Sequence, residues 1–100
     1  MSPGAAAPRD LCFVPAVELA RLYRTRKTSP AEVMDAVLAR VAAVNPRVNA
    51  IVTLDAEGAR AQARKATASL RRSARVGPLH GVPVTIKDVT PTRGLRTTFG

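Results

Sequence analysis

The sequence predicts an α/β fold that is incomplete as a domain. Apolar residues recur at helical spacing behind N-cap signals at Ser29 and Asp55, whereas short β-branched runs at 50–54 and 84–86 favour an extended chain. The 100 residues contain only 3% aromatic side chains, so a core must come from Val, Leu, Ile and a great deal of Ala. Because alanine removes little apolar area from water, hydrophobic stabilisation is limited, and we expect a marginal or incomplete domain.

Three helices are predicted in chain order. The first covers residues 16–26, the second begins at a capping box of Ser29 and Glu32 and ends at Asn45-Pro46, and the third spans Asp55 to about Arg72. The apolar positions expected to face the core are Val17, Leu19, Leu22 and Tyr23 in the first helix, Val33, Met34, Val37, Leu38, Val41 and Val44 in the second, and Ala59, Ala63, Ala66 and Leu70 in the third.

A turn-rich stretch leads into the second β-branched run. Gly77-Pro78 and His80-Gly81 are typical of turns, and Pro83 suits the first residue of a strand. His80 is the only histidine, and no second histidine or nearby cysteine completes a set of metal ligands. We therefore expect His80 to shape the turn by hydrogen bonding, and we predict neither a metal site nor a bound cofactor.

Lys87 ends this run and is the candidate catalytic residue. In a strand, Val84 and Ile86 point to one face, while Lys87 points to the other. A lysine that is removed from water loses its preference for the charged form and can act as a base. The alternative is a strand-end lysine whose ammonium group reaches the solvent. Asp88 points away from Lys87 in such a strand, so we expect it to fix the following turn.

The chain is expected to comprise a flexible tail over residues 1–14 and one folded part over residues 15–100. No stretch has the length and apolarity of a membrane span, and the N-terminus lacks the basic and apolar regions of a secretory signal. Cys12 is the only cysteine, which excludes an intramolecular disulfide and suits a buried structural thiol in a reducing compartment. A cytoplasmic location without a membrane partner follows as the expectation.

The net charge of +9, from 16 Lys and Arg against 7 Asp and Glu, raises the question of nucleic acid. No aromatic residues interleave the basic run and no zinc-ligand spacing is present, so direct binding of nucleic acid is not expected. The alternative function is a small basic helical interaction module without catalysis, for which nucleic acid is one candidate partner and in which Lys87 is merely structural.

The stretch from Gly77 to Asp88, continued through 94–100, closely resembles the opening of the amidase signature family. The family pattern there is G-P-L-H-G-[IV]-P-x-x-[IVL]-K-D, followed by G-x-x-T-x-x-G and a serine. The helical segment 18–50, with its Asn45-Pro46-x-x-Asn49-Ala50 turn, also looks like the family's N-terminal region. The resemblance implies the N-terminal portion of a mixed sheet flanked by helices.

Members of this family hydrolyse amide bonds with a nucleophilic serine, a second serine in a cis peptide, and a lysine as the ultimate base. Lys87 occupies the position of that lysine. The resemblance implies hydrolysis of carboxylic amides to acid and ammonia without a metal or cofactor. The family's serines and glycine-rich loop lie downstream of Gly100, so we expect a fragment that is inactive alone. Val89-Thr90-Pro91 departs from the pattern of many members, which puts only the local loop shape in doubt.

The family includes simple amidases and the A subunits of glutamine-hydrolysing aminoacyl-tRNA amidotransferases. The resemblance implies a small-molecule amide as the substrate of the full-length protein. The resemblance does not decide whether the full-length protein forms a homodimer or assembles with other amidotransferase subunits.

Overall fold

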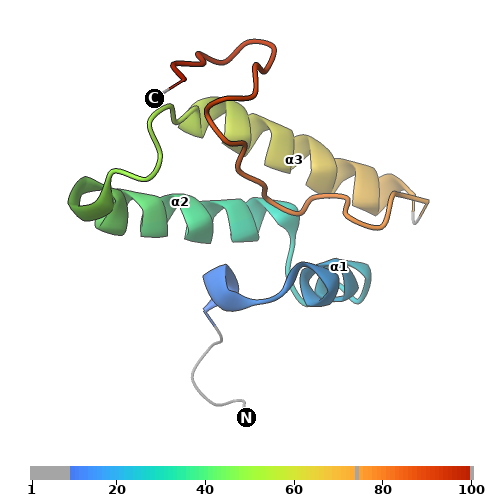
Figure 1. The fold of residues 1–100 in the computed structure, drawn as a ribbon. Coiled ribbons are helices and arrows are strands. Elements are labelled where there is room, and N and C mark those ends of the chain that lie inside the picture. Colours follow the sequence, from blue (N-terminus) through green and yellow to red (C-terminus); the bar gives the residue numbers. More distant parts are fainter. Residues whose placement is uncertain (1–9, 74, 100) are drawn as a thin grey trace.

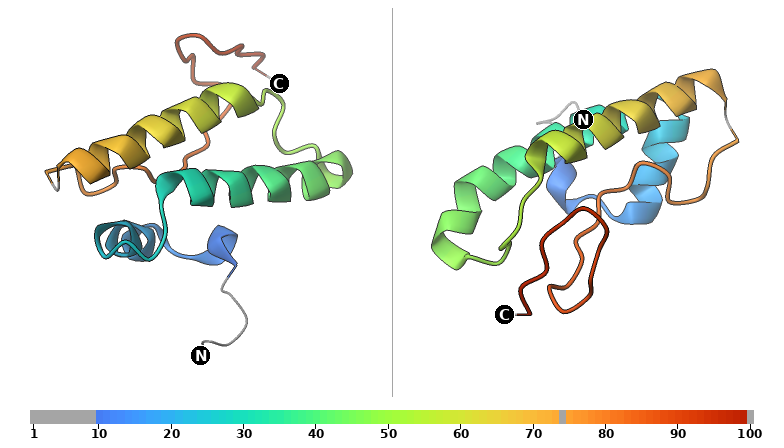
Figure 2. Two further views of the ribbon diagram at one scale, coloured as in Figure 1. Left: turned by 180° about the vertical axis from the view of Figure 1, so that it is seen from behind. Right: turned by 90° about the horizontal axis from the view of Figure 1, so that it is seen from above.

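In the computed structural model, which describes residues 10–73 and 75–99, three α-helices carry the fold (Figure 1). A short 3-10 helix, η1 (Leu11–Phe13), precedes α1 (Ala16–Arg24), α2 (Pro30–Val48) and α3 (Ala56–Arg72). α2 and α3 run antiparallel, and α1 lies beside the N-terminal end of α2 (Figures 1 and 2). The segment after α3 follows one side of this helical pair as an irregular chain.

Local capping explains where α2 and α3 begin. The Ser29 hydroxyl accepts a hydrogen bond from the Glu32 amide at 3.2 Å, and the Asp55 carboxylate accepts one from the Gly58 amide at 2.9 Å. Each bond satisfies an amide that has no partner inside its own helix. Both predicted starting points are confirmed.

The predicted end of α2 at Asn45-Pro46 is wrong, because the helix continues to Val48. Proline cannot donate to the preceding turn, which normally costs a helix interior about 3 kcal/mol. Here Pro46 falls in the last turn, and two neighbouring features close the end. Asn49 adopts the left-handed conformation of a C-cap, at φ 50°, and the Asn45 side chain makes two hydrogen bonds to the backbone of Ile51.

The core is small and centres on Val14, Leu19, Tyr23 and Val33. Val33 is fully buried, so the apolar face of α2 packs between the neighbouring helices α1 and α3. The apolar faces predicted for α2 and α3 are confirmed, since every position named for them is buried or half-buried. In α1 the prediction fails at Val17, whose surface is 79% exposed.

The strands predicted over 50–54 and 84–86 are wrong for the described residues. Both stretches are irregular, and the described backbone has one isolated bridge, between Thr92 and Leu95. A strand is stabilised by hydrogen bonds to a neighbour, and neither run has one within the described parts of the chain. Val84 and Ile86 consequently remain 78% and 53% exposed. The α/β prediction therefore holds here only for its helices.

Of the expected tail, residues 1–9 lie outside the described residues. The remainder includes η1, which packs against α2, and Val14, which belongs to the core. Among the helices that are described, none combines the length and apolar character needed to cross a membrane.

Candidate active site

Two consecutive turns shape the loop before Lys87. The His80 amide donates to the Gly77 carbonyl and the Val82 amide donates to the Leu79 carbonyl, both at 3.1 Å. His80 Nε2 lies 2.9 Å from the carbonyl oxygen of Ala66 in α3. Because a carbonyl only accepts hydrogen bonds, Nε2 carries the proton in this contact. The predicted turn-shaping role of His80 is confirmed.

Gly81 is the point at which this loop meets α1 and α2. Its backbone has φ +80°, and a Cβ atom there would lie 2.5 Å from Cγ of Pro30. The carbonyl oxygen of Gly81 accepts a hydrogen bond of 2.9 Å from the Tyr23 hydroxyl. Only glycine fits both the backbone conformation and the space, so the loop is fixed on the helices six residues before Lys87.

Sequence reasoning missed the role of Tyr23, which it treated only as an apolar position of the first helix. Its side chain is 4% exposed, and burial raises the pKa of its hydroxyl to about 12. The partner is 58 residues away, so no local pattern pointed to the contact.

Lys87 is exposed at the end of the irregular stretch that follows the loop. Its carbonyl oxygen accepts a hydrogen bond from the Thr90 amide at 2.9 Å, which turns the chain away immediately after the lysine. The side chain lines an open groove of about 1080 Å³ between α3 and the segments 50–55 and 81–97. Lys87 is thus presented to a large surface hollow, outside the small core.

The carboxylate of Asp88 is engaged by Thr98. It accepts a hydrogen bond from the Thr98 amide at 2.9 Å and another from the Thr98 hydroxyl. This contact closes the loop that begins at Lys87, as expected for a turn-fixing aspartate. No local pattern pointed to Thr98 as the partner.

The groove offers Lys87 no serine. Its charged lining residues are Lys87, Arg96, Asp55 and Asp88, and the hydroxyl groups among its described residues belong to threonines. Ser29 caps α2, while the Ser73 hydroxyl accepts a hydrogen bond from the Arg75 amide at 3.0 Å. Among the described residues, Lys87 therefore lines a groove that contains no serine to act as the expected nucleophile.

Cys12 is not activated as an alternative nucleophile. The Cys12 thiol donates a hydrogen bond to the Ala36 carbonyl at 3.5 Å. Its pKa is raised mainly by burial, and further by a hydrogen bond to Asp10 and by the negative charge of that residue. A raised pKa disfavours the nucleophilic thiolate. Within the described ranges no group of three His, Cys, Asp or Glu side chains could hold a metal ion.

Comparisons with known proteins identify the family. The family model described as Amidase matches residues 32–100. The chain is 48% identical over 91 residues to the A subunit of the glutamyl-tRNA(Gln) amidotransferase of Acidothermus cellulolyticus, covering 91% of this chain and 18% of the relative. It is 42% identical over 92 residues to an acylamidase of Rhodococcus erythropolis, covering 92% of this chain and 19% of the relative.

A third relative, the A subunit of the glutamyl-tRNA(Gln) amidotransferase from a Roseiflexus species, is 57% identical over 67 residues, which are 67% of this chain and 14% of that protein. No solved structure matches the chain. The chain spans about a fifth of the length of the first two relatives. Because the Amidase model covers more than half of its residues, including the loop that carries Lys87, the chain belongs to the amidase family.

Proposed function

We propose that this chain is the N-terminal portion of a hydrolase that cleaves carboxylic amides to acid and ammonia, and that Lys87 is its base. The observation that carries the proposal is the place of Lys87. It lies within the matched residues 32–100, it follows a loop that is fixed on three helices, and it lines an open groove. Residues 15–100 belong to the amidase domain in this proposal.

The proposed mechanism needs three side chains. The attacking serine passes its proton through a second serine, held in a cis peptide, to the neutral amine of Lys87, and the serine oxygen bonds to the amide carbon. The proton then goes to the leaving nitrogen as the C–N bond breaks, which leaves an acyl-enzyme that water hydrolyses. In this proposal the two serines lie in a further part of the full-length protein, since the chain spans about a fifth of the length of its first two relatives. The 100 residues alone are therefore inactive in this proposal.

The test is made in the full-length protein. Lys87→Ala should lower kcat by about 10²–10⁴-fold, since the relay loses its proton acceptor. Lys87→Arg should be nearly as damaging, because a guanidinium group stays protonated. His80→Ala should act only through loop geometry and be far milder. Near-normal activity of Lys87→Arg, with an unchanged thermal melt, would remove the base assignment.

The named relatives favour two forms of this function. One relative is an acylamidase and others are amidotransferase A subunits, so the protein either acts alone or as a homodimer on a small amide, or works with further subunits on glutamine. Ammonia release from glutamine and from simple amides, measured with and without such subunits, separates the two. A cytoplasmic location is also part of the proposal.

A further inference from the structure

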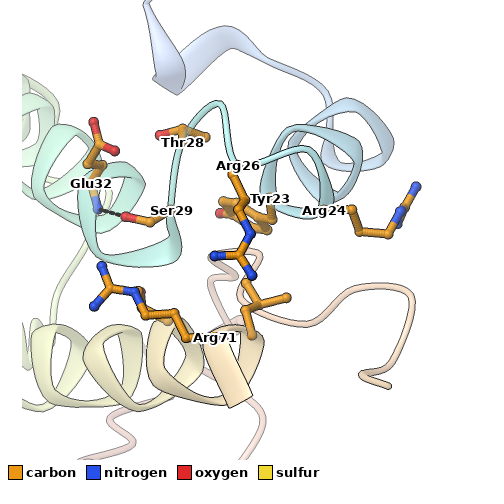
Figure 3. Close-up of a pocket in the computed structure, with 9 residues that line it drawn as sticks. Tyr23, Arg24, Arg26, Thr28, Ser29, Glu32 and Arg71 are labelled. Carbon is orange, nitrogen blue, oxygen red and sulfur yellow. Dashed lines mark hydrogen bonds between the residues drawn. The ribbon is translucent and has the colours of Figure 1, made fainter. Parts of the chain in front are cut away.

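A second cavity shares no lining residue with the groove of Lys87. It has a volume of about 320 Å³ and lies between the α1–α2 connection and the last turns of α3 (Figure 3). That volume is at the lower end of the range of about 300–1,000 Å³ that is usual for small-molecule sites. Its lining residues are Tyr23, Arg24, Arg26, Thr28, Ser29, Glu32, Thr67, Leu70 and Arg71.

The lining is positively charged, with three arginines and one glutamate and hence a net charge of +2. In Figure 3, Arg26 extends from the α1–α2 connection toward α3, and Arg71 extends from α3 toward the start of α2 near Ser29, while Arg24 points outward from α1. Within the described residues, none of these three guanidinium groups forms an ion pair. Their donors are therefore available to an anion.

The cavity walls also contain polar groups, but the N-terminal amides of α2 are not free to bind a ligand. The first free amides of α2 are already used, since Ala31 donates to the Thr67 hydroxyl and Glu32 to the Ser29 hydroxyl. The Thr28 hydroxyl, in contrast, is buried and has no hydrogen-bond partner among the described residues. A buried polar atom of this kind requires a partner, which a bound ligand or water can supply.

We propose that this cavity binds a phosphate group through the guanidinium groups of Arg26 and Arg71. Guanidinium groups match phosphate oxygens in geometry as well as charge, and they donate two parallel hydrogen bonds to them. The phosphate is either free or part of a larger molecule. This site is separate from the groove of Lys87 and does not depend on the proposed hydrolase activity.

The test is a titration of the folded chain with inorganic phosphate in the cold, at constant ionic strength set with sodium chloride, followed by backbone NMR shifts. Saturable shifts should appear at residues 26–29 and 70–71. Arg26→Gln and Arg71→Gln should each weaken binding by at least about tenfold, because each removes a charged hydrogen-bond donor. Arg64→Gln is the matched control, because Arg64 is an exposed arginine of α3 outside the lining, and it should leave binding unchanged. The helical circular dichroism of each variant verifies its fold.

A second arm uses a short oligothymidylate, which carries the same phosphate chemistry on a chain. Tighter binding of the oligonucleotide, still weakened by Arg71→Gln and not by Arg64→Gln, would identify a phosphodiester as the ligand. Equal weakening by Arg64→Gln and Arg71→Gln in both arms would show diffuse attraction to a basic surface and overturn the site. Absence of saturable phosphate shifts in the folded parent chain would also overturn it.

Discussion

The Tyr23 hydroxyl donates a 2.9 Å hydrogen bond to the carbonyl oxygen of Gly81, which joins α1 to the loop before Lys87. A second bond, from His80 Nε2 to the Ala66 carbonyl, joins the same loop to α3. These two contacts with different helices fix a stretch that has no regular secondary structure of its own. They hold the loop six residues before Lys87, where the expected strand is not formed.

Tyr23→Phe should destabilise the chain by about 1 kcal/mol, since one hydrogen bond is lost and the Gly81 carbonyl is left without that partner. The aromatic ring remains in the core, so helix content should not change. Urea unfolding measures the difference. Thr25→Val is the control, because the Thr25 hydroxyl bonds only to exposed helix-end carbonyls, and its effect should be smaller.

The buried Tyr23 hydroxyl also predicts that the stability of the chain depends on pH. The pKa of Tyr23 is about 12 in the folded chain against an ordinary value of 10.0. Above pH 10 the unfolded state therefore loses this proton before the folded state does, and unfolding is favoured. Stability should fall more steeply between about pH 10 and pH 12 in the parent chain than in Tyr23→Phe. Identical slopes for the two chains would contradict the burial of the hydroxyl.

Gly81→Ala should cost about 3 kcal/mol, because alanine is strained at φ +80° and its Cβ would contact Pro30. Gly77→Ala is a matched control in the same loop, since a Cβ there meets nothing within 4 Å. Thermal melts of both variants give the comparison. A loss in Gly81→Ala no larger than in Gly77→Ala would show that the loop does not rest on α2 as described.

The exposed apolar residues after α3 predict self-association. Val84 is 78% exposed in an irregular stretch of β-branched residues that has no strand neighbour among the described residues, and such a stretch can pair with another chain. Val84→Lys should therefore reduce concentration-dependent light scattering. Val17→Lys changes a residue of almost equal exposure, 79%, on the surface of α1, and should have little effect. Equal effects of the two substitutions would indicate that net charge alone governs association.

Local signals in the sequence predicted the helices well and the extended segments poorly. Ser29 and Asp55 each accept a hydrogen bond from the amide three residues further along the chain, so the sequence alone was enough to predict both helix starts. The β-branched run before Lys87 has the right residues for a strand, but a strand depends on a partner elsewhere. The same reasoning accounts for the site. The motif makes Lys87 a candidate, whereas Tyr23 and Thr98 act across 58 and 10 residues and left no local pattern.

The contact between Asp88 and Thr98 supplies the last prediction. The Asp88 carboxylate accepts hydrogen bonds from both the amide and the hydroxyl of Thr98, so it holds the two ends of the loop after Lys87 together. Asp88→Ala removes both acceptors and should speed hydrogen exchange at the Thr98 amide by about tenfold, the effect of a hydrogen bond worth roughly 1.4 kcal/mol. Asp88→Asn keeps one carbonyl oxygen to accept from that amide, and its exchange should be intermediate.

Asp35→Ala is the control for this loop, because Asp35 is also an acidic residue but its carboxylate pairs with Arg60, between α2 and α3. Its removal should leave exchange at Thr98 unchanged. In the full-length protein, Asp88→Ala should also lower kcat/KM, and Asp88→Asn should lower it less. A loosened loop lets Lys87 leave its position, and a displacement of about 1 Å can reduce the rate by about 10²-fold. Unaltered exchange at Thr98 in Asp88→Ala would mean that the loop is held by other contacts, and the link from Asp88 to the placement of Lys87 would be lost.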